Sequence, residues 1–74
     1  MKNKDLIKQF GLEVKRRRVE LALTQEEFAD ISGLHRTYVS GIERGERNPT
    51  LDIIFQIARA LNCLPGDLLP ELSK

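Results

Sequence analysis

The sequence is poor in the residues that build disulfide frameworks, metal sites and membrane spans. Its one cysteine and one histidine provide neither an internal disulfide nor the four ligands of a structural zinc site. Its apolar runs fall short of the roughly 18 residues of a transmembrane helix, and its first residues lack the apolar stretch of a signal peptide. We therefore expect a cytoplasmic protein that has no metal, no cofactor and no membrane partner.

Length and charge set further limits. The chain has 74 residues, of which 41% are hydrophobic and 31% charged, a composition typical of a protein that folds in water around a single core. A domain of this size buries only about 60% of the surface of its unfolded chain, so a partner subunit adds to its stability. The net charge of +1 does not by itself indicate a nucleic-acid partner. We expect a single domain over residues 1–74 that is able to dimerise.

Helical periodicity predicts five helices and no strand. Apolar residues recur at helical spacing along the chain, and helix-start and helix-stop residues divide the pattern into segments. Pro65 suits the first turn of the last segment, which Pro70 interrupts or frays. The expected helices cover residues 4–21, 25–32, 35–44, 51–62 and 65–72. The expected fold class is therefore all-α.

The first two segments have apolar faces that would pack against a core. Gly11 lies inside the first helix and costs it about 1 kcal/mol relative to alanine. The inward positions expected in the first helix are Leu6, Phe10, Val14 and Leu21, and those in the second are Phe28, Ala29 and Ile31.

The segment 25–32 begins and ends with strong local signals. Thr24 and Glu27 form a capping box, in which hydroxyl and carboxylate satisfy each other's backbone amides. Gly33 supplies the left-handed conformation that a tight exit from the helix requires. Ala29 is small where a second helix would cross at a steep angle. These features together predict the first helix and the turn of a helix-turn-helix.

The segment 35–44 has the composition of a recognition helix. Val39 and Ile42 provide its inward face, while its other faces lack the glutamates and lysines of an ordinary solvated helix. Those faces carry Arg36, Thr37, Tyr38, Ser40 and Gly41. In a helix-turn-helix, the second helix enters the DNA major groove.

The segment 51–62 is apolar on two sides. Such a helix is either central to the core or uses one side to meet another chain. In the first case the last helix covers the core of its own monomer, and in the second both helices contribute to a two-fold interface. The candidate interface residues are Ile53, Ile57, Leu64, Leu68, Leu69 and Leu72.

Residues 23–61, LTQEEFADISGLHRTYVSGIERGERNPTLDIIFQIARAL, resemble the phage-repressor-like or XRE helix-turn-helix regulators. Within that family, residues 33–50, GLHRTYVSGIERGERNPT, are most similar to the controller proteins of restriction-modification systems. These are small dimeric regulators that bind operator DNA upstream of their own gene and the endonuclease gene. The resemblance implies a five-helix phage-repressor-like fold, a homodimer on double-stranded operator DNA, and contact with RNA polymerase during activation.

Two other functions remain open at this point. The chain could be an XRE-type repressor of another operon, or a protein-interaction or antitoxin-like module with the same fold. An enzyme is not expected. The sequence has no paired-carboxylate site, no nucleophile with a base, no phosphate-cradling glycine loop and no set of metal ligands.

The resemblance also implies which residues read bases. Arg36 and Thr37 match the base-reading positions, and an arginine can bind guanine O6 and N7 in bidentate fashion. Tyr38 and Ser40 can bind a base edge or a phosphate, and the Tyr38 ring can equally pack on the helix pair. Gly41 departs from the family pattern, because members often read a base there through a side chain.

A second group of residues is expected at the DNA backbone. The resemblance implies a phosphate contact for Gln25, and a helix N-terminus favours an anion; alternatively, Gln25 supports the helix cap. Residues that follow the recognition helix can bind phosphates without reading sequence. The phosphate candidates are Gln25, His35, Arg44, Arg47, Asn48 and Arg17, of which Arg17 can equally face solvent. Arg18 and Glu43 match a family ion pair that orients the first helix against the third.

Overall fold

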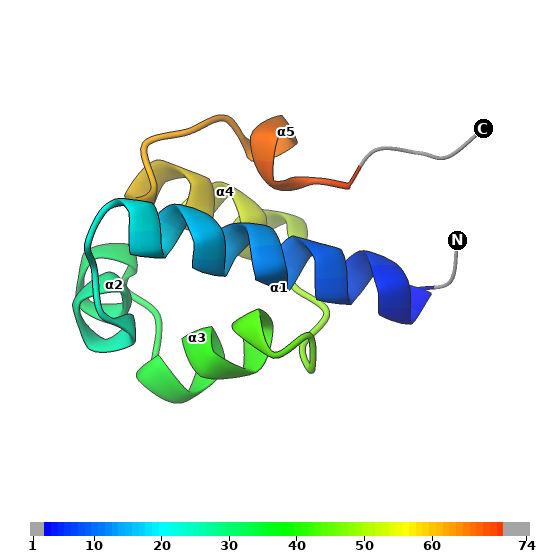
Figure 1. The fold of residues 1–74 in the computed structure, drawn as a ribbon, viewed down its shortest axis with the longest axis horizontal. Coiled ribbons are helices and arrows are strands. Elements are labelled where there is room, and N and C mark those ends of the chain that lie inside the picture. Colours follow the sequence, from blue (N-terminus) through cyan, green and yellow to red (C-terminus); the bar gives the residue numbers. More distant parts are fainter. Residues whose placement is uncertain (1–2, 71–74) are drawn as a thin grey trace.

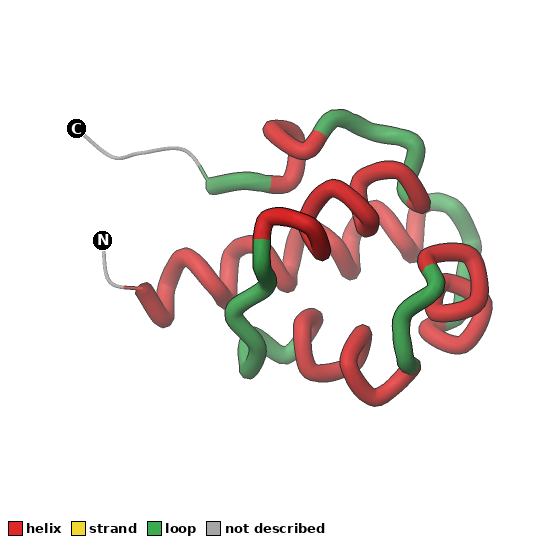
Figure 2. Tube along the Cα trace, turned by 180° about the vertical axis from the view of Figure 1, so that it is seen from behind, coloured by secondary structure: helices red, strands yellow, loops and turns green. Residues whose placement is uncertain are grey.

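The computed structural model describes residues 3–70 and contains five helices (Figure 1). α1 crosses the middle of the molecule, with α3 on one side and α5 on the other, and α2 lies at one end (Figure 1). α4 lies behind α1 in Figure 1 and in front of it in the opposite view of Figure 2. The helices are α1 Asn3–Glu20, α2 Gln25–Ser32, α3 Arg36–Glu43, α4 Leu51–Ala60 and α5 Pro65–Leu68. The predicted all-α, five-helix fold is therefore confirmed. Within the described residues, no helix is both long and apolar enough to cross a membrane.

Most helix boundaries agree with the sequence prediction, but the end of α5 does not. α2 has the predicted bounds, and α3 is flanked by the caps His35 and Arg44. The prediction of a last helix extending to residue 72 is wrong, because α5 ends at Leu68 and Leu69 is extended (φ −86°, ψ 140°). A residue before proline favours this extended backbone, so Pro70 ends the helix. The expected helical position Leu72 lies outside the described residues.

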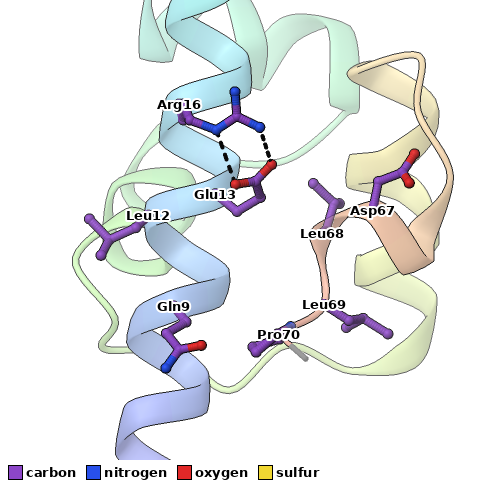
Figure 3. Close-up of a pocket in the computed structure, with 8 residues that line it drawn as sticks. All are labelled: Gln9, Leu12, Glu13, Arg16, Asp67, Leu68, Leu69 and Pro70. Carbon is purple, nitrogen blue, oxygen red and sulfur yellow. Dashed lines mark hydrogen bonds and ion pairs between the residues drawn. The ribbon is translucent and has the colours of Figure 1, made fainter. Parts of the chain in front are cut away.

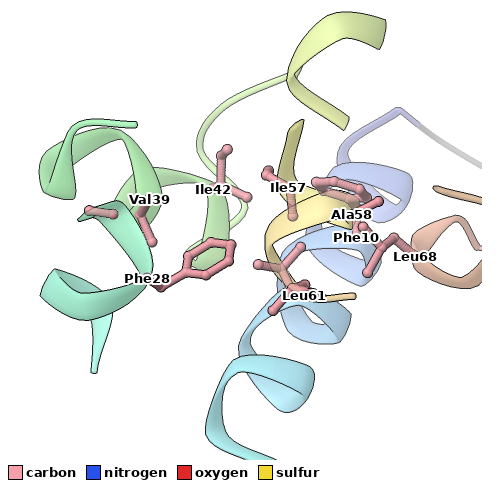
Figure 4. Close-up of a cluster of buried hydrophobic side chains, with 10 residues drawn as sticks. Phe10, Phe28, Val39, Ile42, Ile57, Ala58, Leu61 and Leu68 are labelled. Atoms are coloured by element: carbon pink, nitrogen blue, oxygen red, sulfur yellow. The ribbon is translucent and has the colours of Figure 1, made fainter. Parts of the chain in front are cut away.

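Side chains from all five helices meet in one core (Figure 4). Two expected core residues, Leu21 and Ile31, are instead exposed. Leu21 is exposed because it follows the end of α1. In α2, Ser32 rather than Ile31 is buried beside Phe28 and Ala29, and its hydroxyl donates to the carbonyl of Ala29 at 3.3 Å. The buried apolar residues are Phe10, Val14, Phe28, Ala29, Val39, Ile42, Ile57, Ala58, Leu61 and Leu68.

The predicted start and turn of the helix-turn-helix are present. The Glu27 amide donates to the Thr24 hydroxyl at 3.0 Å, and the Thr24 amide donates to the Glu27 carboxylate at 2.8 Å. Gly33 has a φ of +76°, and its N–H donates to the carbonyl of Ala29 at 2.9 Å. The backbone therefore turns sharply at the glycine, which aims α3 away from the axis of α2.

Gly11 lies where α1 packs against α3, and it is buried. A Cβ atom at this position would overlap the carbonyl oxygen of Ile42 and would lie 3.1 Å from the carbonyl oxygen of Glu43. Helix propensity alone makes this glycine only a cost to α1. The structure shows that it lets the backbones of α1 and α3 come into contact.

α1 ends in a left-handed turn made by an alanine. Ala22 has a φ of +59°, its N–H donates to the carbonyl of Val19, and the N–H of Leu23 donates to the carbonyl of Arg18. These two bonds form the helix end that glycine usually provides, because glycine carries no steric penalty at positive φ.

Replacing Ala22 with glycine is therefore expected to raise the free energy of unfolding by about 1 kcal/mol. Urea unfolding should show a higher midpoint with an unchanged slope. As a control, Ala60→Gly changes a position with ordinary helical backbone in α4, and it should lower the midpoint. A lower midpoint in Ala22→Gly would contradict the expectation.

Candidate nucleic-acid interface

α3 presents one side to the core and the other to solvent. Val39 and Ile42 are buried against the other helices, which fixes the rotation of α3 about its own axis. Its outer side and the loop that follows carry the polar residues Arg36, Thr37, Tyr38, Ser40, Arg44 and Arg47. We call these six residues the recognition surface. In Figure 1, α3 forms the edge of the molecule farthest from α5.

Arg36 and Thr37 begin α3 and are both exposed. Arg36 borders a shallow cavity of about 480 Å³ between the starts of α2 and α3, together with Arg18, Thr24, Gln25 and Glu26. No group within residues 3–70 forms an ion pair with Arg36 or a side-chain hydrogen bond with Thr37. The polar ends of both side chains are therefore available for an external ligand.

Arg44, the C-cap of α3, is held between two polar groups. One guanidinium nitrogen donates to the Ser40 hydroxyl, and another lies 3.0 Å from a carboxylate oxygen of Glu46. The hydrogen bond from Arg44 holds the pKa of the Glu46 carboxyl below its usual range, so this carboxylate is ionised at neutral pH. Ser40 and Arg44 thus contact each other in the free protein.

Arg47 is exposed and lies across α3. Its guanidinium carbon is 5.8 Å from the centre of the Tyr38 ring, within the range of a cation–π contact. A Cβ atom on Gly41 would lie 3.0 Å from Cγ of Arg47, so the missing side chain leaves the space that Arg47 crosses. The Tyr38 ring also packs against the core, as one of the two sequence interpretations proposed.

A buried ion pair joins the recognition helix to α1. Arg18 donates through Nε to Glu43 Oε2 at 2.7 Å and through Nη2 to Oε1 at 3.0 Å. The two side chains are only 9% and 2% exposed. A third guanidinium nitrogen donates to the carbonyl of Leu23 at 2.6 Å. The described residues contain no buried side-chain nitrogen or oxygen without a hydrogen-bond partner, so the cost of burying the charges is offset on both sides.

Gln25 contributes to the same network. Its side-chain amide donates to Glu43 Oε1 at 3.1 Å, a contact that the sequence did not suggest. Its backbone N–H, in the first turn of α2, remains suited to an anion. Of the other phosphate candidates, His35 is the exposed N-cap of α3. Asn48 is exposed in the loop before α4 and borders a cavity with Leu6, Ile7 and Leu69, so its position gives the predicted phosphate contact no support.

The basic run at the end of α1 does not form one basic face. Arg17 borders a cavity with residues of α4 and α5, on the side of α1 away from α3, and its Nε lies 2.7 Å from Glu13. Arg16 also pairs with Glu13, across from α5 (Figure 3). The predicted phosphate contact of Arg17 is therefore not supported, because the side chain is directed away from the recognition surface.

The predicted dimer-interface residues fall into three groups. Ile57 and Leu68 are each 1% exposed within the single chain, so they belong to its core and offer no surface to a second copy, contrary to the prediction. Leu64 and Leu69 are exposed, and Ile53 is half-buried. Leu72 lies outside the described residues. The sequence missed the exposed pair Leu51 and Phe55, one turn apart on α4.

The remaining candidate groups do not suggest a reactive or metal-binding centre. Among residues 3–70, no cluster of histidine, cysteine and carboxylate side chains could hold a metal ion. Burial raises the pKa of the Cys63 thiol, and a protonated thiol is a poor nucleophile and metal ligand.

The chain is similar to known proteins in sequence and in fold. Residues 14–68 match the family described as Helix-turn-helix. Control protein C.SmaI from Serratia marcescens is 58% identical over 47 residues, which are 64% of this chain and 56% of C.SmaI, so the match spans little more than half of that relative. The crystal structure of the restriction-modification controller protein C.AhdI from Aeromonas hydrophila is 41% identical, with a TM-score of 0.83 over 85% of this chain and 96% of that chain.

A further similar structure is the restriction-modification controller protein C.Esp1396I, as a tetramer in complex with its natural 35-base-pair operator. It is 35% identical, has a TM-score of 0.78, and the match covers 84% of this chain and 82% of that chain. The resemblance and the fold expected from the sequence are both confirmed. C.SmaI is a control protein and C.AhdI a restriction-modification controller protein, the class that residues 33–50 resemble.

Proposed function

Because the chain belongs to the helix-turn-helix family that its residues 14–68 match, we propose that it regulates transcription by binding operator DNA. In this proposal it is a controller of a restriction-modification system, acts as a homodimer, and regulates its own gene and the endonuclease gene. The relative C.Esp1396I, which is bound to its operator as a tetramer, supports the DNA part of the proposal. Activation would in addition require a contact with RNA polymerase.

The observation that carries the proposal is the recognition surface on a rigidly held α3. The hydrophobic core and the buried Arg18–Glu43 pair fix this helix, while Arg36 and Thr37 point outward without partners in the described chain. Arg36 would read guanine and Thr37 a base edge or a thymine methyl group. Tyr38 and Ser40 would add base or phosphate contacts.

The DNA backbone would be bound by the groups that border α3. These groups are Gln25, His35, Arg44 and Arg47, and their contacts would position the helix without reading sequence. Asn48, in the loop that follows, would reach a phosphate only at the edge of the interface. Two recognition helices about 34 Å apart fit successive major-groove faces of a two-fold-symmetric site. Of the eight large apolar side chains exposed in the described chain, we assign to the dimer contact those from α4 and the segment that follows it, Leu51, Phe55, Leu64 and Leu69.

Arg36→Ala is expected to weaken binding to the selected site by about 1–3 kcal/mol, roughly five- to 150-fold, and to abolish the preference for one guanine. The measurement is selection of bound sequences from random duplex DNA with the wild-type and variant proteins. A two-fold-symmetric motif would also indicate that two copies bind together. The wild-type affinity should fall steeply with salt, because phosphate contacts release counterions.

Arg59→Ala serves as the matched control, because it removes the same charge from an exposed position on α4. Because Arg59 lies one turn from Phe55 on α4, the readout of this control is the base preference within each half-site, which it should leave unchanged. A wild-type motif that is indifferent to Arg36→Ala would contradict the assignment of α3 as the reading helix. The absence of any enriched motif would favour the protein-interaction alternative.

A further inference from the structure

Among residues 3–70, Arg44 and Glu46 form the one ion pair between an arginine of the recognition surface and a carboxylate. The distance between Nη2 of Arg44 and Oε1 of Glu46 is 3.0 Å. Arg36 and Arg47 form no such pair within residues 3–70. Glu46 is therefore a negative group in the surface that would meet a polyanion.

The backbone after α3 fixes the position of this carboxylate. Gly45 turns the chain with a φ of +75°, and its N–H donates to the carbonyl of Ile42 at 3.0 Å. The N–H of Glu46 then donates to the carbonyl of Gly41 at 2.9 Å. A Cβ atom on Gly45 would lie 2.7 Å from Cγ of Lys8, so the turn also packs closely on α1. The side chain of Glu46 thus leaves a well-fixed turn next to Arg44.

A carboxylate and a DNA phosphate bind a guanidinium in the same way. Both are anions that accept two parallel N–H bonds from the fork of an arginine. One Arg44 nitrogen already donates to Ser40 and another to Glu46. A phosphate that approaches Arg44 must therefore displace Glu46 or lie beside its negative charge.

We propose that Glu46 is an internal competitor for DNA at Arg44. In the free protein, the Glu46 carboxylate occupies the edge of the Arg44 guanidinium that a phosphate takes in the complex. This inference rests on the proposed function, because it requires that α3 faces DNA. Glu46 lowers the affinity for every duplex by a similar factor, since phosphate contacts carry no sequence information. Its effect is to shorten the time that the protein spends on any duplex, without changing the ratio of its affinities for operator and unrelated DNA.

The test compares Glu46→Gln with Glu20→Gln. Glu20 pairs with Arg16 at 3.0 Å, with side chains 61% and 53% exposed, and Glu46 pairs with Arg44 at the same distance, with 59% and 53% exposed. Both substitutions remove one negative charge from an exposed pair, but the Glu20 pair lies on α1, away from the recognition surface. Affinity is measured by titration with the selected duplex and with an unrelated duplex of equal length.

Glu46→Gln is expected to raise the affinity for both duplexes by about fivefold, the ratio that corresponds to an exposed ion pair at its upper strength. Glu20→Gln should change it by less than about twofold, because salt screens a distant charge. In an Arg44→Gln background, Glu46→Gln should give a smaller rise, since no guanidinium is left to be released. This double-mutant cycle measures the coupling between the two residues.

The following outcomes would each overturn the inference. If Glu46→Gln matches Glu20→Gln, or keeps its full effect in Arg44→Gln, Glu46 does not compete at Arg44, although the proposed function stands. A rise confined to the selected duplex would mean that the pair acts on a base rather than on a phosphate. If the wild-type protein binds neither duplex, the proposed function fails and the inference fails with it.

Discussion

Gly11→Ala is expected to destabilise the fold by about 3 kcal/mol or more, although alanine is the better helix former. The added methyl group would overlap the carbonyl oxygen of Ile42, and a backbone atom cannot move aside as a flexible side chain can. Overpacking in a core costs about 1–3 kcal/mol and more where backbone must shift, against a gain of about 1 kcal/mol in helix propensity. A chain of this length is stable by only about 4–11 kcal/mol.

Chemical denaturation monitored by circular dichroism measures this effect. Gly66→Ala is the matched control, because a Cβ atom on Gly66, in α5, would meet nothing within 4 Å beyond its chain neighbours and the backbone of its own helix. It should be neutral or slightly stabilising. Equal stability of the two variants would contradict the close contact between the α1 and α3 backbones at Gly11.

Glu43→Leu is expected to cost about 3–5 kcal/mol, because it leaves the guanidinium of Arg18 buried without its counter-charge. The carbonyl of Leu23 would remain as its acceptor, and Gln25 would lose its partner. The same variant should weaken DNA binding even where it remains folded, because α3 would lose its link to α1. Denaturant unfolding and duplex titration together separate the two effects.

The double variant Arg18→Met with Glu43→Leu provides the decisive comparison. Replacing both partners by apolar groups is often neutral or stabilising, so this variant should recover most of the stability lost in Glu43→Leu. Glu20→Leu, which breaks an exposed pair with Arg16, should cost less than about 1 kcal/mol. A Glu43→Leu variant as stable as Glu20→Leu would contradict the structural role of the buried pair.

Local signals in the sequence were sufficient to predict most of the fold. The capping box at Thr24 and the glycine at position 33 act within a few residues, so they determined the bounds of α2 without reference to the rest of the chain. The exposure of Ile31 could not be predicted in this way, because the inward stripe of a two-turn helix depends on which neighbours it packs against. The left-handed Ala22 was missed because alanine gives no signal for that conformation.

In the candidate site too, local patterns predict some features and contacts across the fold determine the others. The outward position of Arg36 and Thr37 follows from the helical phase set by Val39 and Ile42. Arg17, a phosphate candidate that could equally face solvent, is one of four consecutive basic residues, Lys15 to Arg18. Neighbours on a helix point about 100° apart, so only the packing of the fold shows which way each one faces. The roles of Gly11 and Gln25 depend on contacts across the fold, and spacing along the sequence contains no information about them.

The division of α3 into an inner and an outer side has a consequence for how such a regulator changes over evolutionary time. The inner side carries the apolar contacts and the Glu43 pair, whereas Arg36 and Thr37 contribute nothing to the core. Substitutions at such surface positions usually alter stability by less than about 0.5 kcal/mol. If α3 reads the operator as proposed, drift in the operator can be followed by single amino-acid replacements that require no prior stabilising change elsewhere. Recognition and folding can then evolve independently within one eight-residue helix.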